Sequence, residues 1–198
     1  MRAFVLGLCA ALLAASAGAA AGFRQGADSL ALSFGSYHAV PVVLTHIGIE
    51  GPAQPLPPAI VATTADAGPP RTSGVNALSV PRDVGRDGKW RVSVQWVELL
   101  TDRAWQAEVE VPVHALTVDY GAYALNLIFG PEGMLLIGSD RAGNQPGDRV
   151  DVAVVCGRRM PAADRRWRNA GNELPGLSAV LAMQRPAVGT TRCPVEVR

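Results

Sequence analysis

Alternation of apolar and polar residues in two neighbouring stretches constrains this chain more than any other feature. Between 89 and 98 every second residue is apolar, from Trp90 to Trp96. Between 105 and 111 the odd-numbered residues, from Trp105 to Val111, are apolar and the even-numbered ones are polar. A period of two places alternate side chains on one face of a strand. The two stretches therefore predict an antiparallel hairpin with one face in the core and one face in water.

The same alternation limits how the two strands can pair. Directly opposed residues share a face, so an even-numbered apolar residue of the first strand must oppose an odd-numbered one of the second. A tight turn at Thr101 and Asp102 satisfies this rule, since Asp favours turns through its own backbone hydrogen bonds. It predicts Trp96 opposite Ala107 and Val94 opposite Val109. Trp90 and Trp96 are then core residues rather than a platform for a ligand.

The rest of the chain favours short strands and turns. Its 198 residues include 21 Gly and 15 Pro, and only 6% are aromatic, a composition that suits a strand-rich domain better than a helical one. We expect a mainly β fold, an antiparallel sandwich or a curved sheet, with a loop-rich C-terminal segment. Further strands are predicted at 39–49, 60–63, 75–80, 123–129, 134–138 and 150–156, and short helices at 161–169 and 177–184.

Two stretches in the first half look less regular. Residues 23–37 are interpreted as a leader into the domain. Residues 51–75 are rich in Pro and Gly, and such a long connection is uncommon in a compact domain. It is interpreted either as a mobile binding loop or as a solvated spacer.

Residues 1–22 have the form of a secretory signal. Arg2 supplies a charged start, Phe4 to Ala15 an apolar run, and the small residues before Ala21 a cleavage site. Cys9 follows Leu8 rather than a small residue, which argues against a lipid anchor. We expect export to the periplasm of one mature domain, 23–198, with no integral membrane segment after cleavage.

Export would decide whether the two cysteines of the mature chain can form a disulfide. Cys156 and Cys193 meet an oxidising compartment, where disulfides form and persist. We expect them to pair and to tie the C-terminal segment, about 157–198, to the last sheet strand. The alternative is two free thiols.

No recognisable catalytic or metal-binding constellation is present. His38, His46 and His114 show none of the spacings of metal sites, so neither a metal nor a cofactor is expected. Ser139 lies outside any Gly-x-Ser-x-Gly motif. Glu108 and Glu110 share the water-facing side of one strand and are interpreted as solubilising charges. The competing hypothesis is a periplasmic hydrolase that uses Ser139 or these two glutamates.

One dense group of charges lies after the last predicted sheet strand. It comprises five arginines around one tryptophan: Arg158, Arg159, Arg165, Arg166, Trp167 and Arg168. Arginine and tryptophan are favoured anchors in protein interfaces, so this group predicts a contact surface for an acidic partner. The alternatives are a solvated loop and a site for a phosphate or lipid headgroup. The chain has no charge block of the kind that binds nucleic acid.

Several motifs of the 45–112 region resemble a family of uncharacterised proteobacterial envelope proteins. They are Thr45 to Gly51, Val80-Pro81, the run from Gly88 to Trp96, and Ala107 to Pro112. Members are frequently encoded beside type VI secretion lipase effectors, and some are thought to act as immunity proteins. The resemblance implies a non-enzymatic, protein-binding function, with a secreted lipase effector as the partner. A periplasmic hydrolase or an envelope accessory protein is the alternative.

Overall fold

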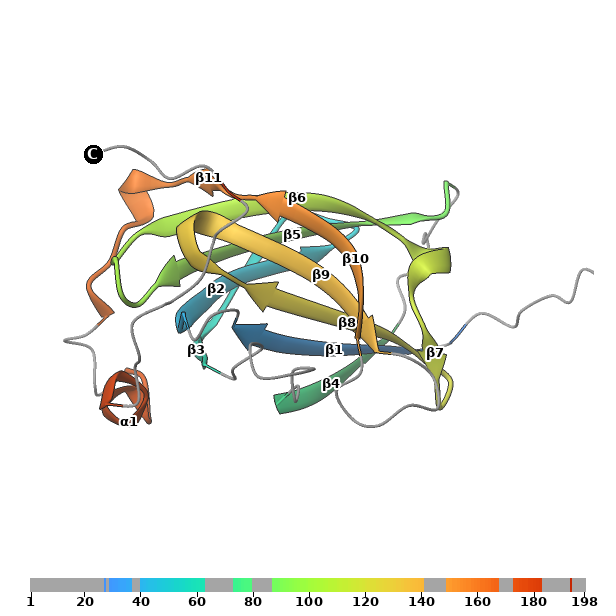
Figure 1. Ribbon diagram of the computed structural model, residues 1–198, viewed down its shortest axis with the longest axis horizontal. Helices are drawn as coiled ribbons and strands as arrows, with labels where there is room; N and C mark the ends of the chain where they lie inside the picture. Colours follow the sequence, from blue (N-terminus) through green and yellow to red (C-terminus); the bar gives the residue numbers. More distant parts are fainter. Residues whose placement is uncertain are drawn as a thin grey trace, which may run out of the picture.

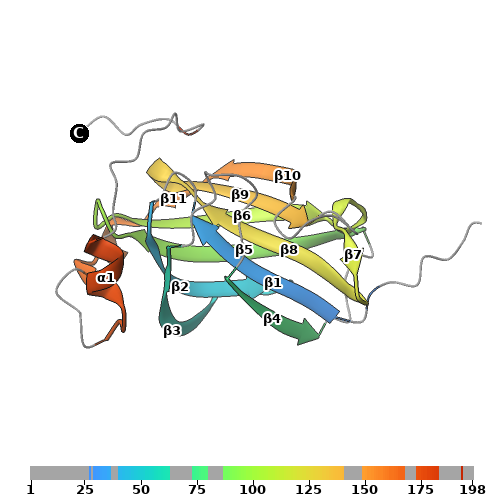
Figure 2. The same cartoon turned by 60° about the horizontal axis from the view of Figure 1, so that its bottom comes forward.

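The computed structural model describes residues 27, 29–36, 40–62, 87–140, 149–167, 173–182 and 193, and the backbone alone of 73–79. These residues form two mostly antiparallel sheets that face each other, confirming the predicted mainly β fold and its sandwich form (Figures 1 and 2). The strands of the first sheet follow the order β10-β9-β8-β1-β4, with β7 beside β8. Those of the second follow the order β11-β6-β5-β2-β3.

The bounds of the strands agree with most of the predicted ones to within a few residues. The first sheet contains β1 (Ser29–Ser36), β4 (Ser73–Ser79), β7 (Val118–Asp119), β8 (Ala122–Phe129), β9 (Met134–Asp140) and β10 (Arg149–Cys156). The second contains β2 (Val42–Ile49), β3 (Gln54–Val61), β5 (Lys89–Glu98), β6 (Ala104–Pro112) and β11 (Arg158–Arg159). Short 3₁₀ helices span Val113–Ala115, Pro131–Gly133 and Pro161–Ala163, and α1 spans Leu177–Ala182.

The predicted hairpin of β5 and β6 supplies one side of the core. Trp90, Val92, Val94 and Trp96 are completely buried, and Trp105, Ala107, Val109 and Val111 are at most 6% exposed. They pack against apolar residues of the facing sheet, including Leu125, Leu127, Phe129, Leu135 and Ile137. The prediction of one core face on this hairpin is therefore confirmed.

The predicted register of the hairpin is wrong by two residues, although its parity is right. Trp96 lies opposite Trp105 and Val94 opposite Ala107. The loop spans 99–102 rather than turning at Thr101 and Asp102 alone, and Asp102 N–H donates to Glu98 O at 2.9 Å. Asp102 takes the left-handed backbone conformation, with φ of 58°, that ends this longer loop. The parity of the pairing could be predicted because it follows from which face of the hairpin is buried. The length of the loop could not, because it depends on contacts of Glu98 and Leu99 with other elements.

Two predictions for the N-terminal half are also wrong. Part of the predicted leader 23–37 is β1, which lies between β4 and β8 and pairs in parallel with β8. Part of the predicted loop 51–75 is β3, the edge strand of the second sheet. Prolines Pro55, Pro57 and Pro58 in β3 lack an N–H donor, so they suit an edge and hinder pairing with a further strand. The signal 1–22 lies outside the described residues.

The chain passes from the first sheet to the second between β10 and β11. Gly157 separates the two strands, and β11 pairs with β6. Gly157 N–H donates to Gly133 O at 2.8 Å, which holds this corner to the turn between β8 and β9. Cys156 and Cys193 form a disulfide, as predicted.

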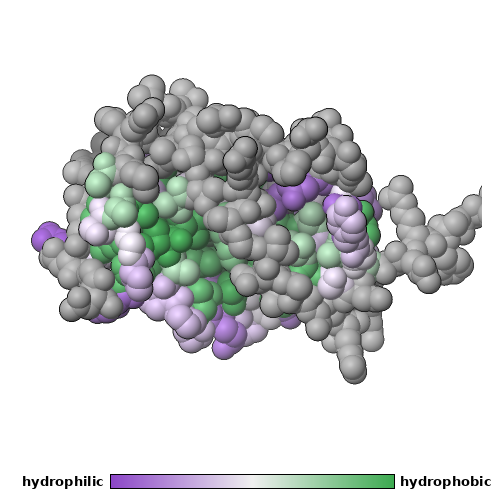
Figure 3. All heavy atoms as spheres, turned by 90° about the horizontal axis from the view of Figure 1, so that it is seen from below, coloured by the Kyte–Doolittle hydropathy of each residue, from purple (hydrophilic) through white to green (hydrophobic). Residues whose placement is uncertain are grey.

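The first sheet is apolar on part of its outer face as well. Ile128 and Leu136 point away from the main core, yet are at most 2% exposed and pack with Val154. Seen from below, strongly hydrophobic residues gather across the middle of the molecule, with hydrophilic residues nearer its margins (Figure 3). Apolar packing in this fold therefore extends beyond the space between the sheets.

Gly133 is the glycine whose replacement should damage the fold most. It has φ of 75°, and an added Cβ would lie 2.3 Å from a ring carbon of Trp105. Gly133→Ala should cost about 1–2 kcal/mol from the left-handed backbone and about 1–3 kcal/mol more from overpacking. Gly121→Ala is the matched control, because Gly121 has φ of 76° but no atom within 4 Å of the added Cβ. Urea denaturation should show the larger loss for Gly133→Ala; equal losses would contradict the packing argument.

Candidate binding site

The outer face of the second sheet is half covered and half open. In one row across the sheet, Val97 pairs with Val43 and with Ala104. These three residues are buried under Trp167, Leu174 and Leu177 of the C-terminal segment. In the next row, Gln95 pairs with His46 and with Gln106, and these side chains are only partly buried. The described part of the C-terminal segment therefore covers the first row and not the second.

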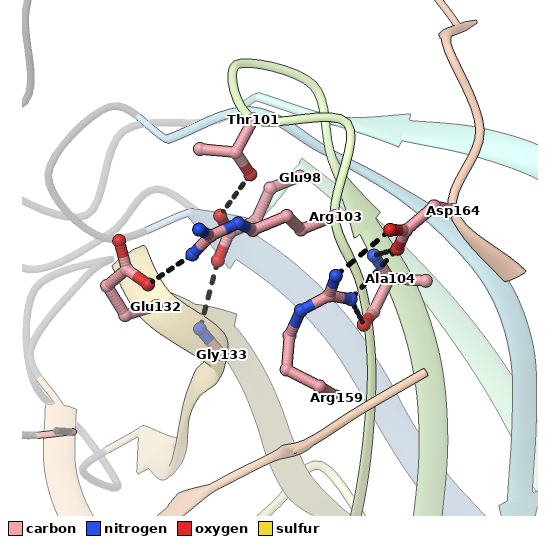
Figure 4. A network of polar contacts seen from close by, with 8 residues as sticks. All are labelled: Glu98, Thr101, Arg103, Ala104, Glu132, Gly133, Arg159 and Asp164. Carbon is pink, nitrogen blue, oxygen red and sulfur yellow. Dashed lines mark hydrogen bonds and ion pairs between the residues drawn. The ribbon is translucent and has the colours of Figure 1, made fainter. Parts of the chain in front are cut away.

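A charged pair fastens this segment to the start of β6. Asp164 Oδ1 accepts a hydrogen bond from Ala104 N–H at 2.8 Å. Arg159 donates to both carboxylate oxygens of Asp164, at 2.8 and 2.9 Å, and to Ala104 O at 2.6 Å (Figure 4). The bonds from Arg159 are the main reason that the pKa of Asp164 lies below its ordinary value. A bidentate arginine–carboxylate pair fixes orientation as well as distance, so the segment after β11 has a defined place on the sheet.

A pocket of about 290 Å³ lies at the boundary between the covered and open halves. Its walls come from the second sheet and from the segment that covers it. The lining residues are mostly apolar, with a few polar groups: Thr45, His46, Pro55, Leu56, Pro58, Gln95, Trp96, Val97, Ala104, Trp105, Met160, Ala163, Arg165 and Trp167. Apolar walls with few polar groups are the usual composition of a binding site.

The polar groups of the pocket are held by a short hydrogen-bond chain. Thr45 Oγ1 lies 3.1 Å from Gln95 O and 3.0 Å from His46 Nδ1. The single hydroxyl proton is donated to the carbonyl oxygen of Gln95, which can only accept. Thr45 Oγ1 must then accept from His46, so Nδ1 carries the proton. In the neutral ring, Nε2 is left as a hydrogen-bond acceptor.

The structure divides the predicted Arg/Trp group into buried, paired and exposed members. Trp167 is only 2% exposed, so its assignment to an exposed contact segment is wrong. Its ring packs in the cluster with Leu174 and Leu177, because a bulky apolar ring gains more against Val97 and Ala104 than in water. Arg159 is tied to Asp164.

The remaining arginines lie at the surface around this pocket. Arg165 is exposed; it stacks over the Trp167 ring at 3.9 Å and pairs with Glu173. Arg158 and Arg166 are exposed and form no ion pair with the residues that the structure describes. Arg158 only donates to Gln106 Oε1, at 3.3 Å. Arg168 lies outside the described residues.

A second, polar pocket of about 300 Å³ lies farther along the same sheet face. Glu50, Arg91, Ser93 and Glu108 contribute to it. Arg91 pairs with Glu108 at 3.0 Å, and both side chains are more than half exposed. Ser93 Oγ donates to Gly51 O and is buried, so this one residue of the predicted water-facing row is covered. Glu50 accepts a hydrogen bond from Arg91 N–H, so each charged group of this pocket is engaged, and acidic groups outnumber basic ones.

Glu98 is the one buried carboxyl group of the described chain. Its Oε2 accepts from Thr101 Oγ1 at 2.7 Å and its Oε1 from Gly133 N–H at 2.9 Å. Beside it, Arg103 pairs with Glu132 at 3.0 Å (Figure 4). Burial raises the pKa of Glu98 above its ordinary value of 4.5, although both hydrogen bonds act in the opposite direction. Glu98 lines neither pocket, so it holds the β5–β6 loop against the β8–β9 turn rather than facing a ligand.

The residues considered for hydrolysis are not arranged for it. Ser139 is completely buried; its Oγ donates to Ala124 O at 2.7 Å and accepts from Thr117 N–H at 2.9 Å. Both bonds hold strands together, and no described histidine bonds to it. Glu110 pairs with Lys89 and does not line the pocket to which Glu108 contributes.

Two absences hold for the described residues. They contain no group of three or more His, Cys, Asp or Glu side chains that could hold a metal ion. They also contain no helix long and apolar enough to cross a membrane.

The architecture is that of a β-sandwich domain whose C-terminal segment covers half of one sheet. No family model, curated protein or solved structure matches this chain. The chemistry of the surface itself is therefore the basis for assigning a function.

The pocket was not predicted from the sequence. His46 and Gln95 are 49 positions apart and meet only because β2 pairs with β5 across a register shift between Leu44 and His46. No spacing in the sequence signals that contact. The burial of Glu98 did have a weak signal in the sequence, because Glu98 lies among the apolar residues Val97, Leu99 and Leu100.

Replacing Glu98 with Gln should change how stability depends on pH. The folded pKa is raised, so the folded state binds more protons than the unfolded state above pH 4.5, and stability falls as pH rises through the folded pKa. Glu98→Gln keeps an acceptor for Gly133 and removes the ionisation. In denaturant titrations, the variant should gain stability relative to the parent as pH rises above 4.5 and through the folded pKa. A difference in stability that stays constant across that range would contradict the assignment.

Replacing Trp167 with Ala should destabilise the domain, in contrast to its exposed neighbour. Removing a buried tryptophan typically costs about 3–5 kcal/mol. Arg166→Ala, one position away on the surface, should change stability by no more than about 0.5 kcal/mol. The two free energies of unfolding are compared by urea denaturation. A cost of less than about 1 kcal/mol for Trp167→Ala would show that the segment does not pack on the sheet as described.

Proposed function

We propose that this chain is an exported, non-enzymatic domain that binds another protein through the pocket and the arginines around it. The observation that carries the proposal is the pair of exposed guanidinium groups of Arg158 and Arg166, which form no ion pair with any described residue and lie on the chain that leads into one wall of the pocket. A guanidinium group binds carboxylates in a bidentate manner, and arginine is enriched among the residues that dominate binding energy. The partner surface is therefore acidic.

The rigidity of the surface supports this proposal. Arg159, Asp164 and Trp167 fasten the segment to the sheet, so Arg158 and Arg166 are presented from a fixed backbone. Groups held in place before binding lose less conformational entropy when a partner arrives. A flexible, solvated arginine loop, the alternative interpretation of this group, would have no such anchor.

The class of partner is proposed from the family resemblance. A domain of this kind would be the immunity partner of a type VI secretion lipase effector, and it would inhibit the lipase by covering the entrance to its active site. Export to the periplasm fits this role, because the effector acts in the envelope. A Cys156–Cys193 pair suits the oxidising conditions of that compartment.

The test is binding of the mature protein to the effector encoded beside it. Arg158→Ala with Arg166→Ala should weaken binding by about tenfold or more, since a dominant interface residue contributes about 2 kcal/mol or more. The same variant should release the lipase from inhibition and reduce the salt dependence of association. Binding is measured by pull-down and calorimetry, and inhibition by lipase activity.

Arg91→Ala is the matched control. Arg91 is also an exposed arginine on this sheet face, but it is paired with Glu108 and lies at the other pocket. Its loss should leave affinity unchanged. A well-folded mature protein that binds no neighbouring effector, or an effect of Arg91→Ala as large as that of the double variant, would overturn the proposal.

A further inference from the structure

The composition of the apolar pocket allows the bound segment of the partner to be specified. We infer that the pocket takes a tyrosine side chain from an acidic segment of the partner, with its phenol hydroxyl donating to His46 Nε2. This inference rests on the proposed function and deepens it by naming the group that enters the site.

The size and walls of the pocket suit one flat, apolar side chain. Its volume of about 290 Å³ lies at the small end of the ~300–1,000 Å³ that is typical of ligand pockets. Pro55 and Pro58 on β3 form one side, and Met160 and Trp167 belong to the covering segment. Rigid walls of proline and tryptophan favour an aromatic ring, which loses little conformational entropy on binding.

Of the polar groups in the pocket, His46 is the one that distinguishes one aromatic side chain from another. Because Nδ1 of His46 donates to Thr45 Oγ1, the neutral ring offers an acceptor at Nε2 and no donor. A phenylalanine ring would leave that nitrogen unsatisfied once water is displaced, which carries a free-energy penalty. The hydroxyl of tyrosine supplies the missing donor, and tyrosine is enriched at the centres of interfaces.

The charges around the pocket describe what flanks the tyrosine. Arg158 lies on the open side, beside Gln106 in the same row as Gln95 and His46. Arg166 lies on the covering segment, between the lining residues Arg165 and Trp167. In the part of that segment that the structure describes, Asp164 is paired with Arg159 and Glu173 with Arg165. The surface therefore attracts carboxylates, placed on both sides of the residue that enters the pocket.

The test uses three blocked pentapeptides: Glu-Glu-Tyr-Glu-Glu, the same peptide with Phe at the centre, and Gln-Gln-Tyr-Gln-Gln. Binding to the mature protein is measured by calorimetry and by tryptophan fluorescence, since Trp96, Trp105 and Trp167 line the pocket. The acidic tyrosine peptide should bind roughly two- to tenfold tighter than the phenylalanine peptide, the range of one hydrogen bond. The glutamine peptide should bind more weakly than the acidic one.

His46→Leu isolates the hydrogen bond. It should abolish the preference for tyrosine over phenylalanine while leaving the affinity for the phenylalanine peptide within about twofold. His114→Leu is the matched control, because His114 is exposed in the 3₁₀ helix Val113–Ala115 and does not line the pocket. It should keep the full preference. A circular dichroism spectrum shows that each variant is folded.

The outcomes separate this inference from the function on which it rests. Equal affinity for the tyrosine and phenylalanine peptides, or a preference that survives His46→Leu, overturns the inference. The same holds if the tyrosine peptide does not bind or does not compete with a protein partner that does bind. If the peptide binds with the expected preference but no effector binds, the result supports the tyrosine pocket and contradicts the proposed effector partner.

Discussion

The packing of two opposed tryptophans against two glycines holds this sandwich together at one corner. Trp96 and Trp105 pair directly across β5 and β6. An added Cβ on Gly133 would clash with the Trp105 ring, and one on Gly157 would lie 2.9 Å from the edge of Trp96. Phe129 completes the contact, with its ring centre 5.2 Å from that of Trp96. Because interiors are packed as densely as crystals, large rings can approach the backbone this closely only where side chains are absent.

The position of the surface site follows from that corner. The hydrogen bond from Gly157 to Gly133 directs the chain from β10 onto the edge of the second sheet, where β11 pairs with β6. From there Arg159, Asp164 and Trp167 lead the segment across the outer face until its cover ends. The pocket exists because this cover stops one row of side chains short of His46 and Gln95. A change that loosened the corner would therefore remove the pocket wall without altering any residue of the proposed interface.

Polar groups in this fold divide by what surrounds them. Glu98 and Ser139 are buried, fully hydrogen-bonded and used to join elements. Lys89, Arg91, Glu108 and Glu110 form exposed ion pairs along the open half of the sheet, and such pairs contribute little to stability. Arg158 and Arg166 differ from both groups, since they are exposed and have no ion-pair partner within the described chain. That difference, rather than the number of arginines, is the basis for the proposed binding surface.

The sequence by itself determined the mainly β class, the hairpin with its tryptophan face, most strand positions and the pairing of Cys156 with Cys193. These depend on local periodicity and on covalent chemistry, which a one-dimensional pattern records. Tertiary structure alone decided the hairpin register, the roles of β1 and β3 as sheet strands, the burial of Trp167 and the meeting of His46 with Gln95. Each depends on which distant segment lies opposite, and a strand in Pro-rich sequence or a tryptophan among arginines looks like a loop until that neighbour is present. Alternation in the sequence shows which face of a strand is buried. Which segment covers that face is decided only by the whole fold.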